Sequence, residues 1–338
     1  MSGPILVFDI GGTSMRAALF DASTGSISAI HRRNSPNHLN QPDSAALASE
    51  ILKELVDLGA EAAGNRRPDS VCIAFPGPLD PDGNTLAAPT LLGGSCVSSF
   101  PISAIAAGLW PLARVHVLND LTAAGYRYAE ELRDFCILTV GSGIGHKVFL
   151  NGVPQVGPGG RGGEIGHLRI DMSADALPCD CGGKGHLGAL ASGRGTLRLA
   201  RSRASSEPAA FAKSIAADLS RGDPERLDNI ILVQAFHAGD SWIRAVVREA
   251  AGRLGQGLAA IHLTLGIETF IVTGGFAQAL GPDYRSLLVE GAQAAGWDLG
   301  QDWDWMIRFG AAEDDDVLVG AGRYAAFLAP GSRRVAGE

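Results

Sequence analysis

The sequence contains few of the features that mark secreted, membrane-spanning or disulfide-stabilised proteins. Only five of its 338 residues are cysteines, too few for a disulfide scaffold in a chain of this length. No unbroken apolar run approaches the roughly eighteen residues of a membrane span, and no basic and then apolar leader precedes the first predicted strand. We therefore expect a protein of the reducing cytoplasm, without a membrane span, in which Cys72, Cys96 and Cys136 are unreactive thiols.

Clusters of basic residues are also rare. The net charge is −8, the isoelectric point is about 5.5, and no basic tract is longer than Arg32-Arg33 or Arg66-Arg67. A nucleic-acid partner is therefore not expected, because such a partner needs a continuous basic surface. The acidic run at residues 313–316 is expected to be a solvated loop rather than a metal site.

The remaining composition is that of an ordinary globular protein, with 46% hydrophobic and 19% charged residues. A length of 338 residues favours two domains with a cleft between them. Strands are expected at residues 5–8, 15–20, 27–33, 71–75, 115–118, 135–140 and 270–273. Helices are expected from Asp43 or Ser44 to about Ala63, over most of residues 196–266, and at 317–328, with an apolar core stripe of Leu254, Leu258, Ile261 and Leu265.

One arrangement of strands and turns occurs twice. Residues 5–20 contain a strand, a glycine turn and a returning strand. Residues 135–152 repeat this order and end in the turn Asn151-Gly152. The repetition predicts an internal duplication.

The first glycine turn, Asp9-Ile-Gly-Gly-Thr-Ser-Met-Arg16, places a carboxylate, two glycines and two hydroxyls after an apolar strand. It can be an ordinary hairpin turn, in which Asp is a common residue. It can also be a phosphate cradle, because glycines let backbone N–H groups approach an anion and a carboxylate can face a metal ion. These eight residues alone are compatible with both interpretations.

A second glycine loop, Gly141-Ser142-Gly143-Ile144-Gly145, also lies between two predicted strands. Such a loop is a weak signal alone, but two opposed hairpins can hold the phosphate chain of a nucleotide from both sides. The pair Gly274-Gly275 follows the strand at 270–273. It either lets an adenine lie against the backbone or makes an ordinary turn from strand to helix.

Asn119 and Asp120 follow the strand at 115–118 and begin a helix. Asp120 can simply be the N-cap of that helix. In a phosphotransfer site it can instead accept the proton of an attacking hydroxyl, as the catalytic-loop Asp does in protein kinases.

Four candidate metal ligands lie close together in the sequence. They are His167, Cys179, Cys181 and His186, and their two thiolates and two imidazoles suit tetrahedral zinc. The Cys-x-Cys spacing is tighter than the common Cys-x₂-Cys spacing. The alternative interpretation is two loop thiols and two surface histidines.

The order of these motifs resembles that of the ROK family, named for repressors, open reading frames and kinases. The resemblance spans about residues 5–325 and also includes Phe75-Pro-Gly-Pro, Glu164-Ile-Gly-His167, Cys179-Asp-Cys181-Gly and Thr273-Gly-Gly. It implies an α/β chain with two ribonuclease-H-like domains of the actin-like ATPase fold, which close on ATP and a sugar at an interdomain active-site cleft. We expect a small N-terminal α/β domain at 1–118 plus about 318–338, and a larger domain with the zinc loop at 119–317. Kinases of this family are generally cytoplasmic homodimers or larger oligomers.

The resemblance also implies roles for individual residues. Mg²⁺ would be held by Asp9 through water, and the phosphates of ATP would meet Gly11, Gly12, Thr13, Gly141, Ser142 and Gly143. The adenosine would face Gly274 and Gly275. Hydroxyls of the sugar would bind Asn119, Glu164 and His167, and the attacking hydroxyl would lose its proton to Asp120.

Two positions depart from the family pattern. ROK proteins commonly bind a structural zinc through one His and three Cys, and here His186 replaces the third Cys, which preserves a ligand. The zinc would fix its loop and orient His167 toward the substrate. In the family's sugar kinases a Glu that binds hydroxyls near the anomeric carbon stands two residues after the third Cys, and this chain has Gly188 there.

The resemblance implies an ATP- and Mg²⁺-dependent kinase that acts on a primary hydroxyl of a hexose or a hexose-like ring polyol. The missing Glu leaves two alternatives: Arg194 or a water replaces it and the substrate is glucose, or the substrate is an aminosugar or a C7-cyclitol. A sugar-responsive repressor is less expected, because eight residues before Asp9 are too few for a helix-turn-helix domain. An ATPase without a sugar substrate is disfavoured by the motif at 164–167 and by the Cys-x-Cys loop.

Overall fold

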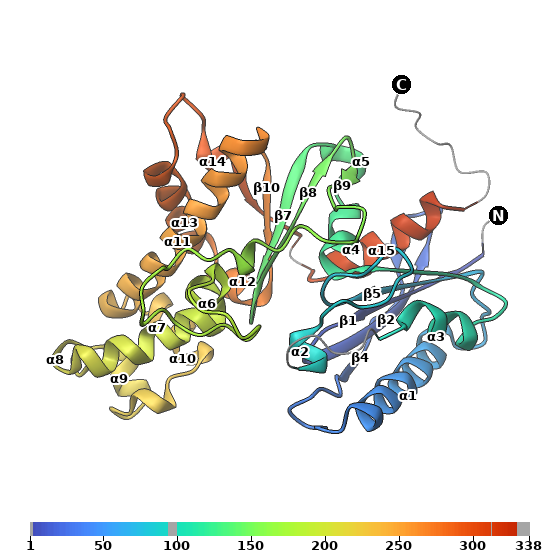
Figure 1. Ribbon diagram of the computed structural model, residues 1–338, viewed down its shortest axis with the longest axis horizontal. Coiled ribbons are helices and arrows are strands. Elements are labelled where there is room, and N and C mark those ends of the chain that lie inside the picture. The colour runs from blue at the N-terminus through green and yellow to red at the C-terminus, as the bar shows by residue number, and fades with distance from the viewer. Residues whose placement is uncertain (1–2, 94–99, 312, 330–338) are drawn as a thin grey trace. The chain divides into compact units, whose positions relative to one another are not determined.

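The computed structural model describes residues 3–93, 100–311 and 313–329, which form two β-sheets with helices packed on them (Figure 1). The chain divides into two compact units. Residues 1–133, 149–162 and 313–338 make the first unit, and residues 134–148 and 163–312 make the second unit. Among the described residues, no helix combines the length and the apolar character that crossing a membrane requires.

The first sheet brings three strand ends to one edge. Its strands are β1 (Ile5–Ile10), β2 (Ser14–Asp21), β3 (Ser26–Ile27), β4 (His31–Asn34), β5 (Ser70–Phe75) and β6 (Arg114–Asn119). Their order is β3-β2-β1-β5-β6, and β4 also pairs with β2. Strands β1, β5 and β6 are parallel, so their carboxyl ends lie at the same edge. That edge carries Asp9, Phe75 and Asn119.

The strand expected at 27–33 is instead two short strands. Antiparallel pairing joins Phe20 to Ile27 and Ala17 to His31 on either side of a break. Residues 28–30 therefore lie opposite the two residues 18–19 of β2, which is the count of a β-bulge. The expectation of one continuous strand was wrong, because apolar content alone does not show an extra residue in the pairing.

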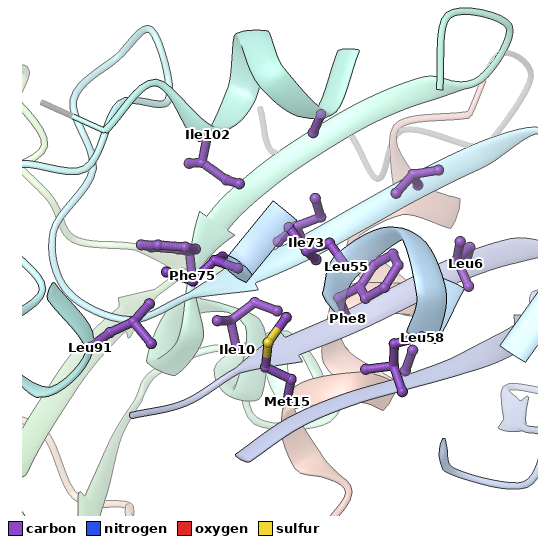
Figure 2. Packing of buried hydrophobic residues seen from close by; sticks show 14 of the residues in the cluster. Leu6, Phe8, Ile10, Met15, Leu55, Leu58, Ile73, Phe75, Leu91 and Ile102 are labelled. Carbon is purple, nitrogen blue, oxygen red and sulfur yellow. The ribbon is translucent and has the colours of Figure 1, made fainter. Parts of the chain in front are cut away.

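Apolar side chains cover both faces of the first sheet. Side chains alternate along β1, so Leu6 and Phe8 lie in one cluster while Ile5 and Val7 lie in the other. Figure 2 shows the first cluster, to which the long helix α1 (Ser44–Ala63) contributes. The helix α15 (Asp316–Phe327) covers the second. The expected helix from 43 or 44 to 63 is confirmed, with Asp43 as its N-cap.

Shorter helices complete the first unit. They are α2 (Pro89–Leu92), α3 (Ile102–Leu109), α4 (Asp120–Tyr126) and α5 (Ala129–Leu132). Helix α4 packs on α15, and a Cβ on Gly320 of α15 would lie 1.8 Å from the carbonyl oxygen of Ala123. This close packing places residues 119–133 in the first unit. The compact units therefore differ from the expected domains, whose boundaries were 118/119 and about 317/318.

The second sheet repeats part of the first. Its strands are β7 (Phe135–Val140), β8 (Ile144–Leu150), β9 (Val153–Pro154), β10 (Phe270–Thr273) and β11 (Ile307–Phe309), in the order β11-β10-β7-β8-β9. Strand β10 runs parallel to β7, as β5 runs parallel to β1. A strand, a glycine turn, a neighbouring strand and a later parallel strand thus occur in both sheets, as the predicted duplication requires.

The second unit is mostly helical between its strands. Its helices are η1 (Ile165–His167), α6 (Leu187–Ala191), α7 (Gly193–Ser206), α8 (Pro208–Phe211), α9 (Ile215–Leu219), η2 (Pro224–Arg226), α10 (Asn229–His237), α11 (Ser241–Leu265), α12 (Gly275–Leu280), α13 (Pro282–Ala295) and α14 (Trp303–Met306). Leu254, Leu258 and Ile261 of α11 are buried as expected. Leu265 is 51% exposed, and its assignment to the core was wrong because it is the last residue of the helix, before the left-handed Gly266.

The acidic run at 313–316 is not a simply solvated loop. Asp316 is 6% exposed, accepts a hydrogen bond of 2.7 Å from the Tyr128 hydroxyl and lies 3.1 Å from Arg127 Nε. Asp315 pairs with Arg127, and Asp314 pairs with Arg16 at 3.0 Å. The expectation considered the charges alone, whereas arginines from other parts of the first unit neutralise them.

Two of the three cysteines that were expected to be unreactive are buried in strands. Cys72 and Cys136 are both 0% exposed, and burial raises the pKa of each, which agrees with the expectation of unreactive thiols. Cys96, for which the same was expected, lies outside the described residues.

Candidate functional site

The first glycine loop is held in place through its carbonyl groups. Ser35 Oγ donates to the carbonyl of Gly11 at 2.6 Å, and Asn37 Nδ2 donates to the carbonyl of Gly12 at 3.0 Å. Both polar side chains are buried. A Cβ on Gly12 would lie 2.6 Å from the carbonyl oxygen of Thr90 in α2, so this position requires glycine. The loop connecting β1 and β2 is thus ordered by residues that come later in the chain.

Asp9 is ion-paired in this structure. Its Oδ2 lies 2.6 Å from Arg16 NH2 and 2.8 Å from Arg16 Nε, and the two residues face each other across β1 and β2. Burial raises the pKa of Asp9, and the Arg16 guanidinium acts in the opposite direction. Arg16 was not among the expected site residues. The sequence did contain a signal for Arg16, because this residue ends the stretch that Asp9 begins and the pairing of a hairpin brings the two residues together.

The structure separates the roles of Asn119 and Asp120. Asn119 is the N-cap of α4, since its Oδ1 accepts from the backbone N–H of Thr122 at 3.1 Å. Its Nδ2 donates to the carbonyl of Gly77 and to Asp120 Oδ1. Asp120 is the first helical residue, and its Oδ1 also accepts from Leu121 N at 2.8 Å. The helix therefore has a cap other than Asp120.

Packing does not explain the glycines of the second loop. Gly141 and Gly143 have ordinary negative φ, and a Cβ on either would meet no atom within 4 Å. Another residue would fit the fold at both positions, so the close approach of a ligand remains a reason for glycine. Arg194 Nε donates to the carbonyl of Ser142 at 3.0 Å and anchors the loop to α7.

Gly274 and Gly275 differ from each other. Gly274 has φ of 97°, and its Cβ would lie 2.6 Å from Thr139 Oγ1, so the turn from β10 into α12 requires glycine there. Gly275 has open space around its Cβ position. The ordinary turn therefore accounts for Gly274, whereas packing does not account for Gly275.

Glu164 and the residue after it contact two polar residues of β8. Its Oε1 is 3.3 Å from Nζ of Lys147, whose side chain is 2% exposed. The next residue, Ile165, donates its N–H to His146 Nδ1 at 3.0 Å. Burial lowers the pKa of His146 to about 4, so the ring is neutral near pH 7 and can accept this bond. Neither His146 nor Lys147 was among the expected site residues, although two polar residues inside an apolar strand were a signal for them.

The four candidate metal ligands come together. The ligand atoms of His167, Cys179, Cys181 and His186 all lie within 4.8 Å of one another. Cys181 Sγ is 3.2 Å from His186 Nδ1, and Cys179 Sγ is 3.7 Å from His167 Nδ1. Burial lowers the pKa of His186, which favours the neutral ring that binds metals, while burial raises the pKa of Cys179. Two nitrogens and two sulfurs gathered in this way fit a tetrahedral zinc ion.

Arg194 already has two partners in this structure. Its NH1 lies 2.8 Å from Oδ2 of Asp180, the residue between the two cysteines, and its Nε is bound to Ser142. A Cβ at Gly188 would lie 3.1 Å from the carbonyl oxygen of Gly166. The proposal that Arg194 replaces the family's Glu is thus disfavoured, because its guanidinium already has two partners.

Each unit gathers its own share of the expected residues. In the first unit the carboxyl edge of the sheet carries Asp9, Gly11, Gly12, Thr13, Asn119 and Asp120. The second unit carries Gly141, Ser142, Gly143, Glu164, His167, Cys179, Cys181, His186, Gly274 and Gly275. One set contains the two aspartates, and the other contains the thiols and the imidazoles.

Comparison with known sequences identifies related proteins over nearly the whole chain. The family model described as ROK family matches residues 5–282. A C(7)-cyclitol 7-kinase from Streptomyces hygroscopicus subsp. limoneus is 37% identical over 334 residues, covering 95% of this chain and 93% of the relative. A 2-epi-5-epi-valiolone 7-kinase from Actinoplanes sp. is 30% identical over 364 residues, covering 97% and 94%.

A solved structure shows the same fold. A ROK family glucokinase from Streptomyces griseus, in complex with glucose and AMPPNP, has a TM-score of 0.75 and 25% sequence identity. The likeness covers 96% of this chain and 99% of the glucokinase. It confirms the α/β class and the actin-like ATPase fold that the motifs predicted.

Proposed function

Because the chain belongs to the ROK family, we propose that it is an ATP-dependent kinase for a primary hydroxyl of a C7-cyclitol, with Asp120 as general base. The observation that carries the catalytic assignment is the position of Asp120 beside a helix cap that Asn119 already provides. A carboxylate at the carboxyl edge of parallel strands, not required for capping, suits the acceptance of a proton from an attacking hydroxyl.

ATP would be bound by both glycine loops. We assign its phosphates to the backbone N–H groups of Gly11, Gly12 and Thr13 in the first unit and of residues 141–143 in the second. Support comes from the buried Ser35 and Asn37, which donate hydrogen bonds to the carbonyl groups of the first loop. The open space around two glycines of the second loop also supports the assignment. The adenosine is assigned to Gly274 and Gly275.

Asp9 is the proposed holder of Mg²⁺. A carboxylate at the end of a strand and beside a phosphate-binding loop is a suitable oxygen donor, and Asp9 has that position. When bound, the ion neutralises charge on the phosphates. Arg16 fixes the orientation of the Asp9 carboxylate through two hydrogen bonds.

We propose a structural zinc ion at His167, Cys179, Cys181 and His186. The gathered donor atoms support it, and so does the tight turn in which Cys179 N donates to Gly183 O. The ion would hold the loop of the two cysteines and would keep the His167 ring in one orientation. His167 and Glu164 are then assigned to acceptor hydroxyls, together with Asn119.

A cyclitol explains the departure at Gly188 better than glucose does. The family's sugar kinases use a Glu there for hydroxyls near the anomeric carbon, and Arg194, the candidate replacement, is bound elsewhere. A carbocyclic ring has no anomeric carbon, so it loses less from the missing carboxylate. The two relatives named for cyclitol substrates support this choice over an aminosugar or glucose.

A panel of acceptors in an ADP-release assay tests the proposal. We expect 2-epi-5-epi-valiolone to be phosphorylated with a higher kcat/KM than glucose or N-acetylmannosamine, and we expect little ADP release without an acceptor. Release of ADP at one rate with and without acceptors would indicate an ATPase. Failure of every acceptor, together with DNA binding in a mobility-shift assay, would indicate a regulator.

Assembly and location are proposed from the family. We propose a cytoplasmic homodimer with a small-molecule substrate and no nucleic-acid partner. Sedimentation of the purified protein tests the oligomeric state, and a monomer at micromolar concentration would contradict it.

A further inference from the structure

Lys147 and Glu164 form an ion pair with one member buried and the other partly exposed. The Lys147 side chain is 2% exposed, the Glu164 side chain is 33% exposed, and Nζ lies 3.3 Å from Oε1. A buried ammonium needs such a partner, because removing an unpaired charge from water is strongly unfavourable. The buried cation therefore lies behind a carboxylate that can still reach a ligand.

The backbone around the pair is shaped to hold it. Gly163 has φ of 77°, and a Cβ there would lie 2.6 Å from both Cδ and Nζ of Lys147. The neighbouring His146 accepts the N–H of Ile165. Two consecutive residues of β8 thus bind this segment: Lys147 pairs with the Glu164 side chain, and His146 accepts from the backbone of the next residue.

Stability is a weak explanation for this pair. Buried ion pairs contribute little net stability compared with apolar residues of the same volume. Within the residues that the structure describes, Glu164 Oε1 is bound by Lys147 while Oε2 has no protein partner. A carboxylate with one oxygen held and the other available is suited to accept a hydroxyl in one fixed direction.

We propose that Lys147 is a positioning residue for the acceptor: it holds Oε1 of Glu164 so that Oε2 accepts a hydrogen bond from a ring hydroxyl. This inference rests on the proposed function, in which Glu164 binds the acceptor, and it adds the residue that fixes the direction of that bond. Lys147 itself acts through Glu164 and takes no proton in the reaction.

The test is a double-mutant cycle measured as KM and kcat with 2-epi-5-epi-valiolone as the acceptor. Lys147→Met should raise the acceptor KM roughly tenfold, the value of one well-oriented charge-assisted hydrogen bond. The KM for ATP should stay within about twofold, because no group assigned to ATP is changed. In the Glu164→Gln background the same substitution should add less than about twofold, since the carboxylate to be positioned is gone. Lys53→Met is the matched control, because Lys53 is an ion-paired but exposed lysine of the first unit.

Each outcome supports or overturns the inference. Equal effects of Lys147→Met with and without Glu164 would show a general structural role and overturn it, as would an unchanged acceptor KM in an active enzyme. If circular dichroism shows that Lys147→Met does not fold, the test compares the double variant Lys147→Met/Glu164→Gln with Glu164→Gln alone. A higher acceptor KM in the double variant than in Glu164→Gln would then overturn the inference. A wild-type protein that phosphorylates no acceptor refutes the proposed function and the inference together, whereas the other failures leave the kinase assignment intact.

Discussion

Replacing Asp120 by Asn removes a proton acceptor while leaving the local structure in place. Asn119, not residue 120, caps α4 by accepting from Thr122 N. The Oδ1 of an Asn at position 120 can still accept from Leu121 N and from Asn119 Nδ2, as the Asp120 oxygen does at 2.8 Å in each case. We therefore expect the free energy of unfolding to change by less than about 1 kcal/mol.

The effect on catalysis should be much larger than the effect on stability. General-base catalysis contributes roughly 10² to 10⁴ in rate, and a hundredfold loss corresponds to about 2.7 kcal/mol of transition-state free energy. An amide cannot accept the hydroxyl proton, but it can still hydrogen-bond the substrate. We therefore expect kcat to fall by roughly 10² or more, with the KM for ATP nearly unchanged.

Steady-state ADP release with a coupled assay measures both constants. Asp228→Asn is the matched control, because Asp228 is a true N-cap that accepts from Ile231 N at 2.7 Å, and Asn is an equally good cap. That variant should keep wild-type kcat. Wild-type turnover in Asp120→Asn would refute the assignment of the general base and would return Asp120 to a purely structural role.

Three further predictions concern the metal, the substrate and the pH dependence of stability. Purified protein should contain about one zinc per chain. The Cys181→Ala variant should lose the zinc and raise the acceptor KM more than the ATP KM, because the orientation of His167 is lost. Metal analysis that finds no zinc in active protein would contradict this prediction. Glucose should be a poor acceptor, with a KM at least roughly tenfold above that of the cyclitol. The Gly188→Glu variant should lower the glucose KM, with the new Cβ placed 3.1 Å from the carbonyl oxygen of Gly166. If glucose were the best substrate of the wild type, the cyclitol assignment would be disproved. Burial raises the pKa of Asp316 to about 6, whereas an unfolded Asp titrates near about 4. The folded state then holds the extra proton between these values, so the free energy of unfolding should fall, on the order of 2 kcal/mol, as pH rises from about 4 to about 6. Urea unfolding of Asp316→Asn should lack this decrease, and an identical pH dependence in both proteins would exclude Asp316 as its source.

Local patterns in the sequence were sufficient for most elements and for the family. Apolar residues at intervals of three or four and an Asp cap define α1, and runs of Val, Ile and Phe define β5 and β7, because these signals depend only on near neighbours. The ordered motifs identified the ROK family and, with it, the kinase chemistry. The four predicted zinc ligands also lie within one short stretch of the sequence, and their donor atoms come together in the structure.

Other features depend on residues that are distant in sequence. No residue close to Asp316 in the sequence shows that Arg127 forms an ion pair with it and that the Tyr128 hydroxyl donates to it. Likewise, no residue next to Glu164 in the sequence shows that Lys147 pairs with it. The extra residue between β3 and β4 has no apolar signature, since it follows from pairing with β2. In each case the outcome depends on which helices, strands and loops pack side by side, and that packing is decided only when the tertiary structure forms. The sequence by itself determined which residue types are available for the chemistry. The tertiary structure decided which partners pair with the charged side chains and orient them, because ion pairs and hydrogen bonds depend on distance in space.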